Sequence, residues 1–361
     1  MAGETNISAG MPVALTETPP DVLAAFLKKV GEPDYRVDQI YRWLYRDMAA
    51  DFHEMSNIPF DLRKALAAHF RVHGLGIESV HQSAGDSTQK FFMPTSEGSP
   101  VEAVLLPRRR GFALCISSQS GCGMACPFCA TGTLGLIRNL TVGEIVDQFL
   151  HGRRTARDLG SELNSVIFMG MGEPLANIDN VEGAIARLVD TKYAGFGARR
   201  ITVSTIGLPG RIPRVALWPW QIGLAISLHA PEDSLRRRLV PASHALPLHE
   251  LMRDAISYQA LTGRRVTYEY VLLGNVNDSL DEARSLGRLL QGQLCHVNLI
   301  PYNPVNGLDY RGTNTRDIAR FQDALESCGI AVTIRRPRGC DIDAACGQLS
   351  ARHNSFRDEC S

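Results

Sequence analysis

The stretch FALCISSQSGCGMACPFC, residues 112–129, joins an apolar β-type run to three closely spaced cysteines. Cys122, Cys126 and Cys129 are close enough in sequence for one loop to present all three thiolates to a single iron–sulfur cube. Three protein ligands leave the fourth iron open, and open coordination positions are typical of catalytic metal sites. We therefore expect a [4Fe–4S] cluster held by these three cysteines, just beyond a strand at 112–117.

Two other interpretations of these cysteines are half of a zinc site and a set of buried thiols. A tetrahedral zinc site needs a fourth close ligand, and none lies nearby in the sequence. The chain has nine cysteines in 361 residues, whereas disulfide frameworks belong to small secreted chains. Clustered thiols favour metal binding or catalysis in a reducing compartment.

Strand and helix patterns alternate from residue 112 onward, which is typical of a parallel sheet. The expected strands cover 112–117, 165–169, 200–204, 222–227, 267–272 and 296–299, and helical periodicity covers 142–154, 181–192, 248–261 and 280–290. We predict the α/β class, with a partial (βα)6-type, TIM-like barrel. Chemistry in such folds sits at the C-terminal ends of the strands.

The region before the barrel has a different pattern. Apolar residues recur at helical spacing from 21 to about 70, and two β-type runs at 88–93 and 101–106 predict a hairpin. We expect a disordered segment at 1–20, a helical accessory domain at 21–87, the barrel with its leading β-hairpin extension at 88–350, and a tail at 351–361. The cations and aromatics at 36, 42, 45 and 46 suit RNA binding by the accessory domain, and a helix that packs on a neighbour and exposes its arginines is an equally good interpretation.

Charge and hydropathy limit the possible partners. The 38 basic and 38 acidic residues balance, which argues against non-specific coating of nucleic acid but allows a local basic groove. Arginines cluster at 108–110, 199–200, 236–238 and 335–338, and each cluster alone is more typical of a solvated face. No apolar run approaches the roughly 18–20 residues that span a bilayer, and 1–20 lacks the features of a secretory signal. We expect a cytoplasmic protein.

Several polar or flexible residues share a position at the ends of the expected strands. They are Gly172, Glu173, Ser204, Ser227, Leu228, His229 and Asn303. Each alone is a common turn residue, but their shared place at one end of the barrel points to a single site. Glycine allows a close backbone approach, and Glu173 has the charge to bind an ammonium group.

The sequence resembles the RlmN/Cfr family of radical-SAM RNA methyltransferases from about residue 35 to 350. The resemblance rests on LCISSQSGCGMACPFC at 114–129, RNL at 138–140, GMGEP at 170–174, STIG at 204–207, SLHA at 227–230, IPYNP at 300–304 and DAACGQL at 343–349. Cys115 and Cys346 are its most diagnostic residues, because other radical-SAM enzymes do not need them. The remaining cysteines, Cys295, Cys328, Cys340 and Cys360, match no role.

The resemblance implies a mechanism that uses two molecules of S-adenosylmethionine (SAM), bound by the strand-end residues and the open iron. Cys346 takes a methyl group from the first, and a 5′-deoxyadenosyl radical from the second abstracts hydrogen from that methyl. The carbon radical adds to adenine, Glu102 removes the ring proton, and Cys115 attacks Cys346 in a transient disulfide that releases the RNA. Strand alternation alone would instead point Glu102 to solvent.

A radical route suits the substrate, because carbons 2 and 8 of adenine have no lone pair to attack a sulfonium methyl. The resemblance favours methylation of carbon 2 of adenosine at position 2503 of 23S rRNA, in the peptidyl transferase centre, and at tRNA position 37. Alternatives are Cfr-like methylation of carbon 8 and a radical-SAM enzyme with a non-RNA substrate. The expected partners are RNA and a low-potential electron donor such as flavodoxin or ferredoxin, and we expect a monomer.

Overall fold

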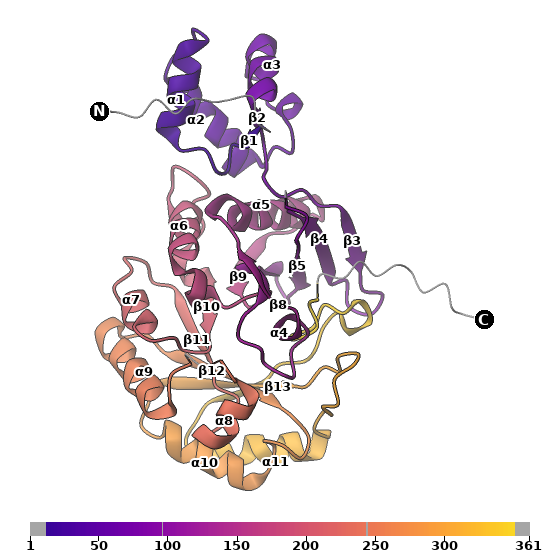
Figure 1. The fold of residues 1–361 in the computed structure, drawn as a ribbon, viewed down its shortest axis with the longest axis vertical. Helices are drawn as coiled ribbons and strands as arrows, with labels where there is room; N and C mark the ends of the chain where they lie inside the picture. The colour runs from indigo at the N-terminus through magenta and orange to yellow at the C-terminus, as the bar shows by residue number, and fades with distance from the viewer. Residues whose placement is uncertain (1–11, 96, 243–244, 351–361) are drawn as a thin grey trace, which may run out of the picture.

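The computed structural model describes residues 12–95, 97–242 and 245–350 (Figure 1). The predicted tail at 351–361 and the first eleven residues lie outside this range. Within it, no helix combines the length and apolar character needed to cross a membrane.

A ten-stranded sheet forms the centre of the molecule, in the order β14-β13-β12-β11-β10-β9-β6-β5-β4-β3. Seven neighbouring strands are parallel: β6 (Phe112–Cys115), β9 (Leu163–Phe168), β10 (Ile201–Thr205), β11 (Gly223–Ser227), β12 (Val266–Leu272), β13 (Cys295–Pro301) and β14 (Val332–Ile334). The linear order leaves two edges, so the barrel is open, and the predicted partial-barrel fold is confirmed. The sequence predicted the first six of these strands but not β14, which has only three residues.

Helices cover the outer side of the parallel strands (Figure 1). They are α5 (Val142–Asp158), α6 (Ile178–Val189), α7 (Arg211–Ala216), α8 (Asp233–Leu239), α9 (Leu248–Thr262), α10 (Leu280–Leu290) and α11 (Thr315–Glu326). Four of them, α5, α6, α9 and α10, were predicted. Helix α5 starts at a capping box, in which Thr141 Oγ1 accepts from Glu144 N and Glu144 Oε2 accepts from Thr141 N. These reciprocal bonds satisfy backbone donors that the first turn otherwise leaves unpaired.

Three antiparallel strands extend the sheet beyond β6: β5 (Pro100–Pro107), β4 (Gln89–Pro94) and β3 (Ser79–Gln82). The hairpin of β4 and β5 was predicted. The register places Val104 of β5 opposite Cys115 of β6. Because alternate residues share a face, Glu102 lies on the same side of the sheet as Cys115.

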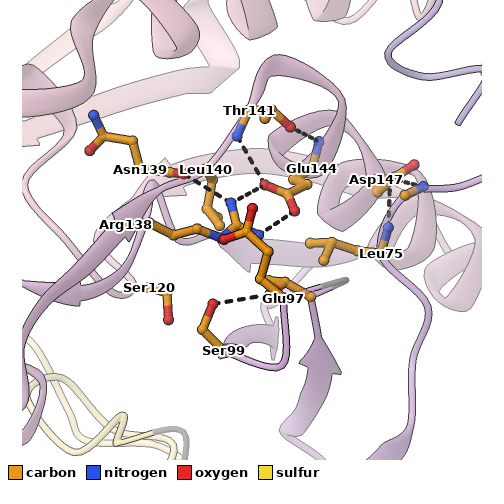
Figure 2. A network of polar contacts seen from close by, with 12 residues as sticks. Leu75, Glu97, Ser99, Ser120, Arg138, Asn139, Leu140, Thr141, Glu144 and Asp147 are labelled. Carbon is orange, nitrogen blue, oxygen red and sulfur yellow. Dashed lines mark hydrogen bonds and ion pairs between the residues drawn. The ribbon is translucent and has the colours of Figure 1, made fainter. Parts of the chain in front are cut away.

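The loop after β6 forms a second small sheet from β7 (Gln119–Cys122) and β8 (Gly135–Asn139), with the short helix α4 (Ala130–Thr133) between them. Arg138 of β8 forms two charged hydrogen bonds with Glu144 of α5, at 2.6 and 2.8 Å, and an ion pair with Glu97 at 3.3 Å (Figure 2). These contacts fix the β7–β8 hairpin against α5.

The N-terminal part of the chain folds as a helical unit with α1 (Pro20–Lys29), α2 (Tyr35–Arg42) and α3 (Phe60–His69). Short strands β1 (Val13–Ala14) and β2 (Phe70–Arg71) pair in parallel. Ala14 and Leu15 are buried. The predicted disordered segment at 1–20 is therefore too long, because its last residues complete the core of the helical unit.

Asp147 of α5 connects this unit to the barrel. Its buried carboxylate accepts hydrogen bonds from the backbone of Gly74 at 2.7 Å and Leu75 at 2.9 Å (Figure 2). Thr16 Oγ1 and His73 Nδ1 also contact it, at 3.2 and 2.8 Å. One carboxylate thus holds both ends of the helical unit.

Candidate active site

The three cysteines of the opening motif line one cavity of about 170 Å³ at the C-terminal ends of the parallel strands. Cys122 ends β7, and a left-handed residue, Ala125, turns the loop between Cys122 and Cys126. Burial raises the pKa of all three thiols, that of Cys122 to about 12. Thiolates in this place need a positively charged partner, which the irons of a cluster provide.

This arrangement does not support the zinc interpretation. Among the described residues, no three His, Cys, Asp or Glu side chains are grouped to hold a single metal ion. The three sulfurs of a cubane site need not meet at one point, because each thiolate binds a different iron. The donor set and its common cavity therefore fit a [4Fe–4S] cluster with three cysteine ligands.

The turn after β9 brings Glu173 into the same cavity. Its carboxylate accepts hydrogen bonds from the backbone N–H groups of Leu175 and Ile206, both at 2.9 Å. Burial raises the pKa of Glu173 to about 6, so the group is mainly ionised at neutral pH. Gly172 has a φ of 97°, and a Cβ there would lie 2.5 Å from Gln119. The turn therefore requires glycine.

The next two strands place Ser204, Ser227 and His229 in this cavity. The hydroxyls of Ser204 and Ser227 lie 3.3 Å apart. His229 Nδ1 accepts a hydrogen bond from Val271 N at 3.1 Å, and burial, followed by the charge of Arg236, lowers the pKa of His229 to about 3. The imidazole is therefore neutral, with its proton on Nε2.

Leu228, between Ser227 and His229, is fully buried in the main core and does not line this cavity. Its backbone N donates to the carbonyl of Glu269. The Leu228 side chain therefore serves packing, and its predicted role in binding SAM remains a prediction that concerns its backbone.

Asn303, after β13, connects the strand ends to the C-terminal loop. Its amide donates to the carbonyl of Cys346 at 3.1 Å. The same loop is bonded to α4, where Ala130 N donates to Gly347 O and Thr131 Oγ1 to Leu349 O. The loop that carries Cys346 is thereby fixed next to Cys129.

Cys346 lies where two cavities meet. It lines the cavity of the cluster cysteines and also a larger one of about 400 Å³ that contains Cys115. Cys346 is exposed and Cys115 is buried. Burial raises the pKa of Cys115 to about 12, with a further contribution from Cys346, and Arg335 opposes the rise at both thiols.

The expected disulfide between these cysteines is not present. Within the described part of the chain, Cys115, Cys346 and the other cysteines are all free thiols. A disulfide bond as a standing feature of this protein is therefore not supported, since the two thiols share a cavity unbonded.

Glu102 is buried, so the expectation from strand alternation that it points to solvent is wrong. It forms an ion pair with Lys90 at 3.0 Å, and its Oε2 accepts from Ser350 N at 3.0 Å. It lines neither cavity, but it faces the side of the sheet that holds Cys115.

Comparison with known proteins agrees with this geometry. Residues 13–72 match the ribosomal RNA large subunit methyltransferase N-terminal domain, and residues 116–286 match the radical SAM superfamily. A Symbiobacterium thermophilum protein, described as a probable dual-specificity RNA methyltransferase RlmN, is 44% identical over 331 residues, covering 91% of this chain and 89% of that protein. The chain belongs to the RlmN family.

Two further comparisons support membership of the RlmN family. A protein of Caldicellulosiruptor saccharolyticus with the same description is 40% identical over 339 residues, covering 94% of this chain and 97% of its own length. The crystal structure of a radical SAM methyltransferase from Sphaerobacter thermophilus has 43% identity and a TM-score of 0.91, covering 94% of this chain and all of that one. The protein is thus a radical-SAM RNA methyltransferase, a transferase that uses a [4Fe–4S] cluster and SAM.

Sequence reasoning missed two groups that support this RlmN-family site. Gln119 accepts from Glu173 N and donates to Asn139 Oδ1, both at 2.8 Å, so it joins the β7–β8 hairpin to the turn after β9. Arg335 pairs with buried Glu269 at 3.4 Å and lines both cavities. A glutamate within the apolar pattern at 267–272 was the available signal for the second group.

Proposed function

We propose that this enzyme methylates carbon 2 of adenosine at position 2503 of 23S rRNA and at position 37 of tRNA. The observation that carries the proposal is the place of Cys346, which lines both the cavity of the cluster cysteines and the cavity of Cys115. A thiol at this junction has access to a methyl donor on one side and to a nucleobase on the other. The name of its relatives, dual-specificity RNA methyltransferase, supports two RNA substrates.

When bound, the cluster and SAM supply first a methyl group and later a hydrogen-abstracting radical. The protein would bind SAM in the cavity of the cluster cysteines. The residues from the strand ends that line this cavity are Gly172, Glu173, Ser204, Ser227, His229 and Asn303. Glu173 provides the negative charge for the ammonium group of SAM. Neutral His229 and the two serine hydroxyls offer hydrogen bonds without adding charge.

Cys346 acts as the methyl carrier. Its sulfur exchanges its proton for the methyl group of SAM, and the activated methyl carbon then bonds to the adenine ring. The pKa of the Cys346 thiol is raised, mainly by desolvation, and the charge of Arg335 opposes this rise. Arg335 thus favours the thiolate needed for methyl transfer.

Glu102 and Cys115 complete the reaction. Glu102 removes the ring proton, for which it must exchange its contacts with Lys90 and Ser350. The ring radical must also give up one electron, which the cluster would accept. The Cys115 thiolate then attacks the sulfur of Cys346 and forms a transient disulfide; the electron pair of the broken bond stays on the methylene carbon, which takes up a proton and becomes the methyl group on the base. An external dithiol would return the disulfide to two thiols. A second thiol in the same cavity is what such an exchange requires.

We also propose that residues 21–87 form an RNA-binding domain, that 88–350 form the catalytic core, and that a monomer accepts electrons from flavodoxin or ferredoxin. We expect RNA binding that depends on salt and is lost when residues 1–87 are deleted. We also expect the mass of a monomer in solution. A dimer would contradict the proposed oligomeric state, and unchanged RNA binding would contradict the domain assignment.

The experiment is anaerobic reconstitution with SAM, a reductant and either 23S rRNA fragments or tRNA, followed by mass spectrometry of the nucleosides. We expect 2-methyladenosine from both RNAs. The variant Cys346→Ala should transfer no methyl group, and Cys115→Ala should accumulate a covalent protein–RNA adduct. Cys340→Ala is the matched control, because Cys340 is exposed and close enough to Cys346 for that thiol to raise its pKa, but has no assigned role. Formation of 8-methyladenosine, or 5′-deoxyadenosine without RNA methylation, would contradict the proposal.

A further inference from the structure

Four arginines surround the larger cavity, which also contains Cys115 and the accessible Cys346. Arg108 comes from the turn between β5 and β6, and the others follow β14: Arg335, Arg336 and Arg338. Among the described residues, none of those that line this cavity is an aspartate or glutamate. Two segments more than two hundred positions apart in the sequence thus build a cationic wall.

These charges are only partly compensated. Arg335 pairs with Glu269 at 3.4 Å, and Arg338 is 4.0 Å from Asp86. Among the described residues, Arg108 and Arg336 have no carboxylate within ion-pair distance. Burial lowers the pKa of Arg108, and the charges of Arg335 and Arg338 lower it further. Like charges held together in this way favour the binding of an anion.

The other arginine clusters have different environments. Arg236 is buried and donates to the carbonyls of Leu246 and Ile206, at 2.9 and 2.5 Å, so it holds the loop structure together. Arg199 is exposed and bonded to Gln221, and Arg200 lies over the ring of Phe196. None of these three arginines lines either cavity. Only the first and last clusters converge on the reactive cysteines.

We propose that Arg108, Arg336 and Arg338 bind backbone phosphates of the substrate RNA on either side of the target adenosine, whose base enters the cavity toward Cys346. This proposal rests on the proposed function and assigns the phosphate-binding residues at the same site. A guanidinium binds phosphate through two parallel hydrogen bonds. Enzymes that modify a base inside folded RNA must expose it, and phosphate contacts on both sides hold the strand in that conformation.

The cavity has a suitable size for this role. Its volume of about 400 Å³ lies within the range of small-molecule pockets, about 300–1,000 Å³. The apolar residues Leu106, Ile167 and Ile300 line it together with the amide of Asn298. We call Arg108, Arg336 and Arg338 the rim of the cavity. Apolar lining residues with a rim of guanidinium groups match a nucleobase attached to its phosphates.

The test measures RNA affinity as a function of salt for the full-length, reconstituted enzyme. The variants are Arg108→Gln, Arg336→Gln and Arg338→Gln, and the matched controls are Arg199→Gln and Arg200→Gln, which remove exposed arginines away from the cavity. Each rim variant should bind a tRNA anticodon stem-loop about tenfold more weakly. It should also reduce the slope of log K against log salt by about 0.7–1.

The variant Arg336→Lys separates the contribution of charge to RNA binding from that of hydrogen-bond geometry. It should keep the salt slope but lose part of the affinity, because lysine cannot form two parallel hydrogen bonds with a phosphate. Iron and sulfide content equal to that of the unmodified enzyme verifies folding. Rim variants with unchanged affinity and slope, or controls that weaken binding equally, would overturn the assignment of the phosphate site while leaving methylation intact. Failure of the unmodified enzyme to methylate either RNA would instead overturn the proposed function.

Discussion

Gln119 offers a direct test of how the protein positions the SAM-binding turn. The side chain is 1% exposed and makes two hydrogen bonds of 2.8 Å, one from Glu173 N and one to Asn139 Oδ1. The variant Gln119→Leu keeps a similar volume but leaves the buried N–H of Glu173 unsatisfied, whereas the exposed Asn139 can bond to water. One unsatisfied buried group costs about 1–3 kcal/mol, so we expect a loss of stability of about 1–3 kcal/mol.

Part of this loss of stability should appear as weaker binding of SAM. Gln119 packs against Gly172 and bonds to Glu173, so a shift of the turn moves the carboxylate that binds the SAM ammonium. If about 1.4 kcal/mol of the loss reaches this contact, SAM affinity falls about tenfold.

Equilibrium dialysis with SAM and the electron paramagnetic resonance spectrum of the reduced cluster, with and without SAM, measure the effect without turnover. Gln148→Leu is the control, because Gln148 is equally buried and bonds to the backbone of Ser117, at 2.8 and 3.0 Å, without touching the turn. It should lose stability but keep SAM affinity. Equal SAM affinity in both variants would refute the positioning role of Gln119.

Three further predictions concern other parts of the site. SAM affinity should fall as the pH drops below about 6, because the raised pKa of Glu173 lets the carboxyl lose its charge there, and Glu173→Gln should remove this dependence in dialysis experiments. Lys90→Met should remove the ammonium partner of the buried Glu102 carboxylate, at a cost of about 3–5 kcal/mol, and should slow RNA methylation. Denaturant titration and single-turnover assays measure the two effects, and wild-type values would contradict the ion-pair role. Asp147→Asn should lower stability by about 2 kcal/mol and raise the KM for RNA more than that for SAM, and an equal rise in both would argue against a role in orienting the N-terminal unit.

Local sequence patterns were sufficient for much of the fold. The strands from β6 to β13 and helices such as α5 have the apolar periodicity that burial on a parallel sheet requires. Helix α11 was not predicted, although Ile318, Phe321 and Leu325 are spaced by three and four residues and face the core. β14 was missed because three residues carry no measurable period, and β1 because its partner lies more than fifty residues away.

At the site, too, local patterns predicted what lies within one stretch of sequence but not what distant segments bring together. The cluster cysteines lie within one short loop, so their spacing alone predicted their common cavity. The ion pair of Arg335 with Glu269 joins β12 to the chain after β14, and Lys90 meets Glu102 across two strands. Such pairs depend on sheet register, which no local pattern contains. Nor does a local pattern show that the side chain of Leu228, between two cavity residues of a strand end, points into the core.

The central claim is that Cys346 carries the methyl group, and one measurement tests it most directly. The reconstituted enzyme is incubated with SAM under reducing, anaerobic conditions without RNA, digested, and its peptides are analysed by mass spectrometry. We predict a single methyl group on Cys346, with Cys115 and Cys340 unmodified, and transfer of this group to RNA added later. A methyl group on another residue, or RNA methylation by the Cys346→Ala variant, would contradict the account.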